Sequence, residues 1–402
     1  MTEPHSPFCL RILLTFFCLA LMTSCGGGEA GKPTGDERLA TLQLDATFPE
    51  GFGYLSGIRL LSDGRILAAD PNSQVLLRLD LDAGTADTLG GHGKGPQEYE
   101  GPDQVFPLPG DSTLLVDLGN GRLTVVGPEG TFVDWTPMSN RNELAPGGIR
   151  TVRPQFVDMA GNIYVTAPYW LEGPPDSTAI HRVDRASGVE TSVAWEWHPE
   201  RVRRPRGAKR PMLVLSDDWA VGADGRVAVV RSNGYSVDWY LPDGRVTQGA
   251  PYDVETFPVG PAEMEAQVER FAADATYTFA MVGEGGIQSQ QTSRGLPPGT
   301  TQEVDDFEWP EMLPVFWQGR TLVSPWGEAW VQRHMPAGGP GRIEVFDKQG
   351  IRLGYVELSP GSKVLGFGAG ADAESIAYVA REDDMGLIWL ERRLIVWMED
   401  RR

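Results

Sequence analysis

One short frame recurs along this chain and constrains its fold more than any other feature. In each copy a turn residue precedes a strand of apolar and small residues. The six copies are DGRILAAD (63–70), GDSTLLVD (110–117), AGNIYVTA (160–167), ADGRVAVV (223–230), WGEAWVQR (326–333) and AESIAYVA (373–380). Taken from Gly64, Ser112, Gly161, Gly225, Gly327 and Glu374, the steps are about 48, 49, 64, 102 and 47 residues, a spacing typical of propeller blades. The frame therefore predicts an all-β chain folded as a six-bladed β-propeller.

The composition fits such a fold and excludes one class of partner. The 402 residues include 49 Gly and 31 Pro, which supply the backbone angles that short hairpin turns need. The formal net charge is -20 at pH 7. Nucleic-acid binding rests on neutralised phosphates, so a field of this sign argues against a nucleic-acid partner. We expect a monomer.

Residues 1–24 have the pattern of an export signal. The apolar run ILLTFFCLALM, about 11 residues, is too short to cross a bilayer but fits the central region of a secretory signal. The segment resembles a bacterial lipoprotein signal, in which a cysteine after small residues becomes lipidated. Cys25 follows Thr23 and Ser24 in this way, although Met22 stands where that family prefers Leu. The resemblance implies a lipid anchor on Cys25, and the alternative is plain secretion with cleavage near Ser24.

The cysteine count agrees with the anchor. Of the 3 Cys, Cys9 and Cys18 lie inside the signal, so a processed chain would keep Cys25 alone. Residues 25–38 are Gly-rich and charged, which predicts a flexible tether. The expected organisation is a signal peptide at 1–24, a tether at 25–38 and a propeller at 39–402.

The two ends of the propeller segment are expected to meet. Residues from Leu39 to Ala46 alternate between apolar and polar side chains, which is typical of a strand. The C-terminal stretch GLIWLERRLIVWM (386–398) needs a partner of this kind. Because closing a sheet removes an exposed edge, we expect the N-terminal strand to complete the last blade.

The step of about 102 residues predicts an insertion at about 253–312, between blades 4 and 5. A helix is expected from Pro261 to Val282, because Met264, Val268, Phe271 and Phe279 follow helical spacing. The stretch from Gly283 to Thr301 has no period and is expected to be a mobile loop. The insertion is either a cap over one face or a functional lid.

Three segments carry a resemblance to a family. They are GGHGKGPQEYEGP (90–102), in which Gln97 and Tyr99 depart from the family pattern, NGYSVDWYLPDGRV (233–246) and FPVGPAEMEA (257–266). With them the chain resembles the six-bladed propeller lipoproteins of Gram-negative bacteria, which are related in shape to NHL-repeat proteins. The resemblance implies the same fold and a cell-envelope location, as an outer-membrane lipoprotein facing the periplasm or the exterior. It carries over no catalytic residue.

Motifs for catalysis, metal binding and cofactor binding are missing from the sequence. Lys94 is followed by Gly95 rather than Ser or Thr, so the Gly-rich loop is not a P-loop; there is no HExxH, no Cys pair for zinc and no G-x-S-x-G elbow. We therefore expect no catalytic residue, no metal and no cofactor. A hydrolase would need carboxylates gathered from several blades, and Asp103, Asp158 and Asp218 lie out of phase with one another.

The remaining candidates are aromatic and acidic. Trp170 lies before the loop LEGPPD, and Trp309 lies close to Asp305 and Asp306. Aromatic faces beside carboxylates suit a ligand site. The main interpretation is a membrane-tethered binding or scaffold module of the envelope, for a protein, peptide or glycan. The alternative is an envelope metal-dependent hydrolase or lactonase with its site in the propeller channel.

Overall fold

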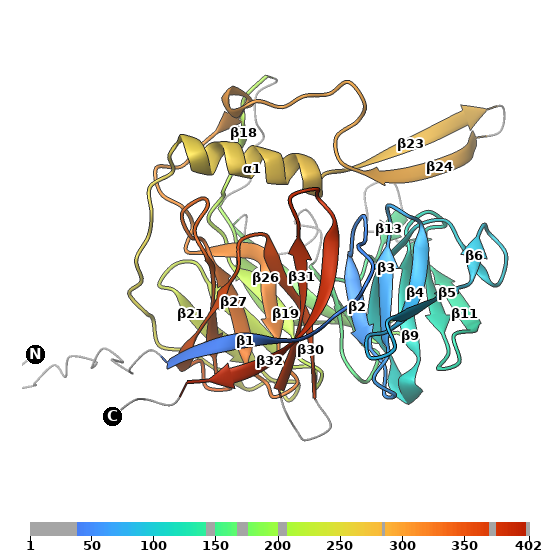
Figure 1. Ribbon diagram of the computed structural model, residues 1–402, viewed down its shortest axis with the longest axis horizontal. Helices are drawn as coiled ribbons and strands as arrows, with labels where there is room; N and C mark the ends of the chain where they lie inside the picture. Colours follow the sequence, from blue (N-terminus) through green and yellow to red (C-terminus); the bar gives the residue numbers. More distant parts are fainter. Residues whose placement is uncertain are drawn as a thin grey trace, which may run out of the picture. The chain divides into compact units, whose positions relative to one another are not determined.

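The computed structural model describes residues 38–141, 149–166, 176–199, 207–283, 286–369 and 375–398. Within these ranges the fold is all-β and propeller-like (Figure 1). Most strands belong to four separate four-stranded sheets and one eight-stranded sheet in this part of the chain. No helix of the described residues is long and apolar enough to cross a membrane.

The four separate sheets each contain strands that follow one another along the chain. The first holds β2 (Gly57–Leu60), β3 (Ile66–Asp70), β4 (Val75–Asp80) and β5 (Thr85–Leu89). The second holds β8 (Pro102–Pro107), β9 (Thr113–Asp117), β10 (Arg122–Val126) and β11 (Phe132–Pro137). The third holds β14 (Phe156–Val157), β15 (Ile163–Thr166), β16 (Ser177–Val183) and β17 (Glu190–Trp197). The fourth holds β19 (Asp218–Val221), β20 (Val227–Arg231), β21 (Ser236–Tyr240) and β22 (Val246–Thr247).

The eight-stranded sheet brings the two ends of the chain together. Its order is β26 (Phe316–Val323), β27 (Ala329–Arg333), β28 (Gly341–Phe346), β29 (Arg352–Leu358), β1 (Arg38–Thr47), β32 (Ile388–Trp397), β31 (Ser375–Glu382) and β30 (Ser362–Ala369). β1 pairs antiparallel with β32 and, over a shorter stretch, parallel with β29. In Figure 1 the blue β1 lies beside the red β32. The predicted pairing of the N-terminal strand with the C-terminal strand is confirmed.

Of the remaining strands, two form a hairpin in the insertion and the others form short pairs. These are β6 (Gly91–His92) with β7 (Glu98–Tyr99), β12 (Ser139–Arg141) with β13 (Ile149–Thr151), and β18 (Arg210–Pro211) with β25 (Phe307–Glu308).

The recurring frame marks the second strand of each four-stranded sheet and two strands of the eight-stranded sheet. It leads into β3, β9, β15, β20, β27 and β31. The turn glycine has a positive φ in four copies, for example 88° at Gly64 and 79° at Gly225. A residue with a Cβ is strained in that conformation, so these four copies favour glycine there.

Alternation along the second strands builds the core. Successive side chains of a strand face opposite sides of the sheet. Ile66 of β3 therefore packs in a cluster with Tyr378 of β31, whereas its neighbour Leu67 packs in a second cluster with Leu115 of β9. The first sheet thus shares buried apolar side chains with both the second sheet and the last strands of the chain. The other four clusters of the described residues also join sets of strands that follow one another.

The insertion differs from the prediction in its second half. Helix α1 runs from Pro261 to Asp274 and does not continue to Val282. Residues Thr276–Gly283 form β23, which pairs with β24 (Gly286–Arg294), so Phe279 belongs to a strand and part of the expected loop is a hairpin. The physical reason is the run Thr276 to Phe279, in which β-branched and aromatic residues favour extended backbone.

Helix α1 packs through Phe271, one of the residues that follow the predicted helical spacing. Phe271 meets Phe307 of β25 edge to face at 5.6 Å, and the Arg210 guanidinium lies 4.8 Å from the Phe271 ring. At the other end, Glu263 accepts hydrogen bonds from the backbone N–H of Gly260 and of Ala337. The Phe271 contacts fix the helix against β18 and β25, and Glu263 connects its first turn to the segment before β28.

Candidate functional site: a cavity between first strands

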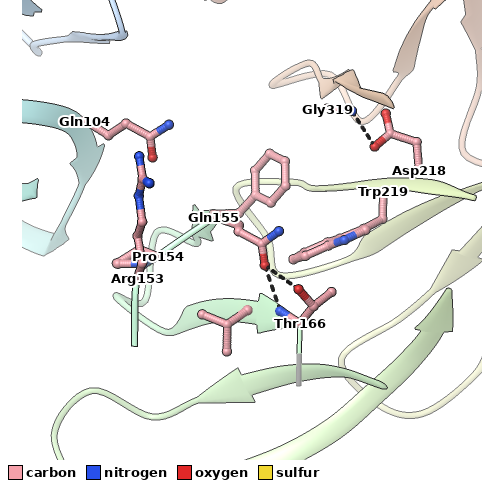
Figure 2. Close-up of a pocket in the computed structure, with 10 residues that line it drawn as sticks. Gln104, Arg153, Pro154, Gln155, Thr166, Asp218, Trp219 and Gly319 are labelled. Carbon is pink, nitrogen blue, oxygen red and sulfur yellow. Dashed lines mark hydrogen bonds between the residues drawn. The ribbon is translucent and has the colours of Figure 1, made fainter. Parts of the chain in front are cut away.

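A cavity of about 530 Å³ lies between four strands. Three of them, β8, β14 and β19, are the first strands of four-stranded sheets, and the fourth, β26, is the first strand of the eight-stranded sheet. In a propeller these positions surround the central channel. Figure 2 shows the side chains that line it. They are Gln104, Arg153, Pro154, Gln155, Phe156, Val165, Thr166, Asp218, Trp219 and Gly319.

Arg153 supplies the positive charge of the wall. Its Nη2 lies 2.7 Å from Oδ2 of Asp103, and its side chain is 49% exposed, against 12% for Asp103. The backbone carbonyl of Asp103 accepts a hydrogen bond from the Ser56 hydroxyl. Asp103 therefore connects β8 to the loop before β2 and holds the Arg153 guanidinium at the cavity.

Gln155 is oriented by its neighbour in the sheet. Its Oε1 accepts hydrogen bonds from the backbone N–H of Thr166 at 2.7 Å and from the Thr166 hydroxyl at 3.1 Å. Because the amide oxygen is used in this way, the amide NH₂ is the end that can serve another partner. Gln155 thus presents a donor.

Asp218 is a buried carboxyl that is held by β26. It accepts hydrogen bonds from the N–H of Gly319 (2.8 Å), the N–H of Thr321 (3.1 Å) and the hydroxyl of Thr321 (2.6 Å). Burial raises the pKa of Asp218, against the opposing effect of these hydrogen bonds. The carboxyl connects β19 to β26 and forms part of the cavity wall at that junction.

Two aromatic rings give the cavity an apolar side. Phe156 meets Trp219 edge to face at 5.0 Å, with an interplanar angle of 60°. Trp219 is almost fully buried, whereas Phe156 is half-buried. The Phe156 ring is therefore the more accessible apolar surface.

The three carboxylates considered for a hydrolase do not form one cluster. Asp103 pairs with Arg153, and Asp218 with Thr321. Asp158 accepts hydrogen bonds from the Asn162 amide and the Tyr164 hydroxyl, which fixes the turn before β15. Among the residues that the structure describes, no group of three or more His, Cys, Asp or Glu could hold a metal ion.

The acidic and aromatic residues predicted for ligand binding lie away from this cavity. Asp305 and Asp306 are exposed in a short 3-10 helix (Val304–Asp306), and Asp306 accepts a hydrogen bond from the N–H of Glu303. The indole N–H of Trp309 donates to the Val304 carbonyl at 2.9 Å. Cys25 and Trp170 lie outside the described residues.

Sequence reasoning missed the residues that the cavity brings together. Gln104, Arg153, Gln155, Phe156 and Trp219 come from separate strands and loops, and no motif connects them. One weak signal exists: the polar pair of Arg153 and Gln155 lies just before β14, the strand that precedes the third copy of the frame. First strands precede the frame in every set, so polar residues just before it are the ones to examine.

Comparison with known proteins gives a likeness of fold without a family. No family matches the sequence, and no curated protein matches it. A calcium-binding protein, regucalcin from Agrobacterium tumefaciens, is similar at 12% identity, over 89% of this chain and 96% of that one, with a TM-score of 0.39. Virginiamycin B lyase from Staphylococcus aureus is similar at 10% identity, over 87% of each chain, with a TM-score of 0.35. A gluconolactonase from Xanthomonas campestris is similar at 12% identity, over 85% of this chain and 72% of that one, with a TM-score of 0.24. At these values the likenesses carry no argument about activity.

Proposed function

We propose that this chain is a membrane-tethered six-bladed β-propeller of the cell envelope that binds a small molecule in the cavity between β8, β14, β19 and β26. The observation that carries the proposal is the cavity itself. Its volume of about 530 Å³ falls in the range typical of small-ligand sites. A fixed guanidinium, an oriented amide and an aromatic ring converge on it, as expected for a specific site.

The eight-stranded sheet supports the proposed number of six blades. It consists of two sets of four strands, which the parallel pairing of β1 with β29 joins at Arg38, Leu39 and Ala40. Counted as two blades, these sets and the four separate sheets make six. The apolar cluster that joins β3 to β31 supports closure between the first and last blades.

The tether and the location rest on the sequence. Cys25 would carry the lipid and anchor the chain in the outer membrane, facing the periplasm or the exterior. Replacing Cys25 with Ser should prevent acylation and release processed protein from membranes after a high-salt wash, because no apolar chain would then hold it. Retention of the variant equal to that of the wild type would refute the anchor.

A variant that fills the cavity tests the binding site. Gln104→Trp adds a large side chain to the wall, whereas Gln349→Trp adds the same side chain at an exposed turn. A thermal-shift screen with metabolites and glycans identifies compounds that stabilise the wild type. Stabilisation should disappear in Gln104→Trp and persist in Gln349→Trp. If Gln104→Trp still responds to every compound found, the cavity is not the site.

The second candidate is a hydrolase or lactonase, and Asp218 is the observation that favours it. A buried carboxyl with a raised pKa beside a cavity is a recognised feature of catalytic sites. Hydrolysis of glucono-1,5-lactone by the wild type, abolished in a folded Asp218→Asn variant, would support the enzyme over the binding module.

A further inference from the structure

The cationic and the acidic side chains of the cavity lie on different sides of it. Figure 2 shows Arg153 and Gln104 together on one side and Asp218 with Gly319 on the other. The guanidinium is positive, whereas the carboxyl side carries either a negative charge or a neutral acid. An anionic group of a ligand is therefore favoured on the Arg153 side.

Arg153 is prepared to hold such a group. Its Nη2 contacts Oδ2 of Asp103 at 2.7 Å in the part of the chain that the structure describes. A guanidinium has five N–H donors in a planar fork, so one carboxylate partner leaves an edge for a second. Asp103 thereby reduces the conformational freedom of Arg153 before a ligand arrives.

The neighbouring amide adds a second donor of the same kind. Because Thr166 occupies the Oε1 atom of Gln155, the NH₂ group of Gln155 is available to an acceptor. Guanidinium and amide N–H groups together match a carboxylate, which accepts hydrogen bonds through two oxygens. The half-buried Phe156 ring, backed by Trp219, offers an apolar surface for the rest of the ligand.

We propose that the cavity binds a small monocarboxylate with an apolar or aromatic body, its carboxylate on Arg153 and Gln155 and its body against Phe156. This inference rests on the proposed function, since it assigns a ligand class to the same cavity. Asp218 sets the orientation. Its oxygens already accept three hydrogen bonds from β26, and in its ionised form Asp218 repels a second carboxylate beside it.

A pair of probes that differ only in charge tests the ligand class. 4-Phenylbutyrate carries the carboxylate and 4-phenylbutyramide replaces it with a neutral amide of similar shape. Calorimetric titration should give the wild type about tenfold higher affinity for the acid than for the amide, as expected for a charge-assisted contact. Raising the salt concentration should reduce this preference.

Two substitutions assign the preference to the named groups. Arg153→Gln should remove the preference for the acid while leaving affinity for the amide within about twofold of the wild type. The control is Arg245→Gln, which breaks an exposed ion pair with Asp243 and should bind both probes like the wild type. Gln155→Glu keeps an oxygen for Thr166 but adds a negative charge, so it should lower the affinity for the acid more than the affinity for the amide. It also serves if Arg153→Gln fails to fold.

The outcomes separate this inference from the proposed function. Equal affinity of the wild type for both probes, or a preference that survives both substitutions, overturns the carboxylate assignment. So does failure of both probes to bind at about 1 mM. In each case the proposal that the cavity is the binding site is kept if compounds from the screen no longer stabilise Gln104→Trp. It is refuted if they still do.

Discussion

His334 makes the stability of this protein sensitive to mild acid. It follows β27 and is 5% exposed, and its ring stacks on Trp317 of β26 at 3.6 Å. The guanidinium of Arg270, from helix α1, lies 4.0 Å from the Trp317 ring. Burial, with a contribution from the charges of Arg270 and Arg333, lowers the pKa of His334 from 6.5 to about 3.

The direction of the pH effect follows from that shift. The unfolded chain binds the His334 proton near pH 6.5, whereas the folded chain does not bind it until about pH 3. The stabilisation is therefore complete above pH 6.5 and is lost as the pH falls through that window. Applied to one site with these two pKa values, linkage predicts a loss of about 2 kcal/mol in unfolding free energy between pH 7 and pH 5.

His334→Phe removes the titrating group and keeps an aromatic ring on Trp317. Urea unfolding followed by circular dichroism at pH 7, 6 and 5 measures the difference. The wild type should lose about 2 kcal/mol more than the variant over this range. His92→Asn, at an exposed position, should keep the wild-type pH dependence. If wild type and His334→Phe lose the same free energy, the argument from burial is wrong.

Three further predictions concern the framework around the cavity. Deleting residues 26–47 removes β1 and exposes the edge of β32, so it should lower the melting temperature clearly. Deleting residues 26–36 should not lower it, and equal melting temperatures of the two truncations would refute closure by β1. Glu344→Gln removes a fully buried charge that lies 2.8 Å from Arg333 and should cost about 3–5 kcal/mol in chemical unfolding. In Gly354→Ala the new Cβ would overlap a backbone carbonyl oxygen of β1, so denaturation should show a loss of at least about 2 kcal/mol, and a neutral outcome would show that β1 does not pack there.

Much of the fold could be predicted because its signals are local. The turn glycine of the frame needs a positive φ, as Gly64 and Gly225 show, and the strand behind it must be apolar on both faces because its two sides enter different clusters. The pairing of β1 with β32 could also be anticipated, because an alternating strand without a partner and an unpaired C-terminal strand satisfy each other.

The insertion shows where local reasoning fails. Helical spacing continued from Met264 through Phe279, yet the helix ends at Asp274, with Ala275 in extended backbone. Apolar residues at every third or fourth position fit a helix and a strand alike over a short window, so β-branched Thr276 and Thr278 were the better guide. Spacing located the helix correctly, but composition determined its end.

The cavity depends on information that no local pattern contains. Asp103 and Arg153 lie 50 positions apart, and Asp218 meets Thr321 at a separation of 103. Asp103 and Asp218 were visible as acidic residues near blade strands, but their roles depend on which partners the sheets place beside them. Asp103 orients the Arg153 guanidinium toward the cavity, whereas the backbone of β26 and the Thr321 hydroxyl hold Asp218. Two carboxylates of similar sequence context thus take different roles, because each is defined by the strand that packs next to it.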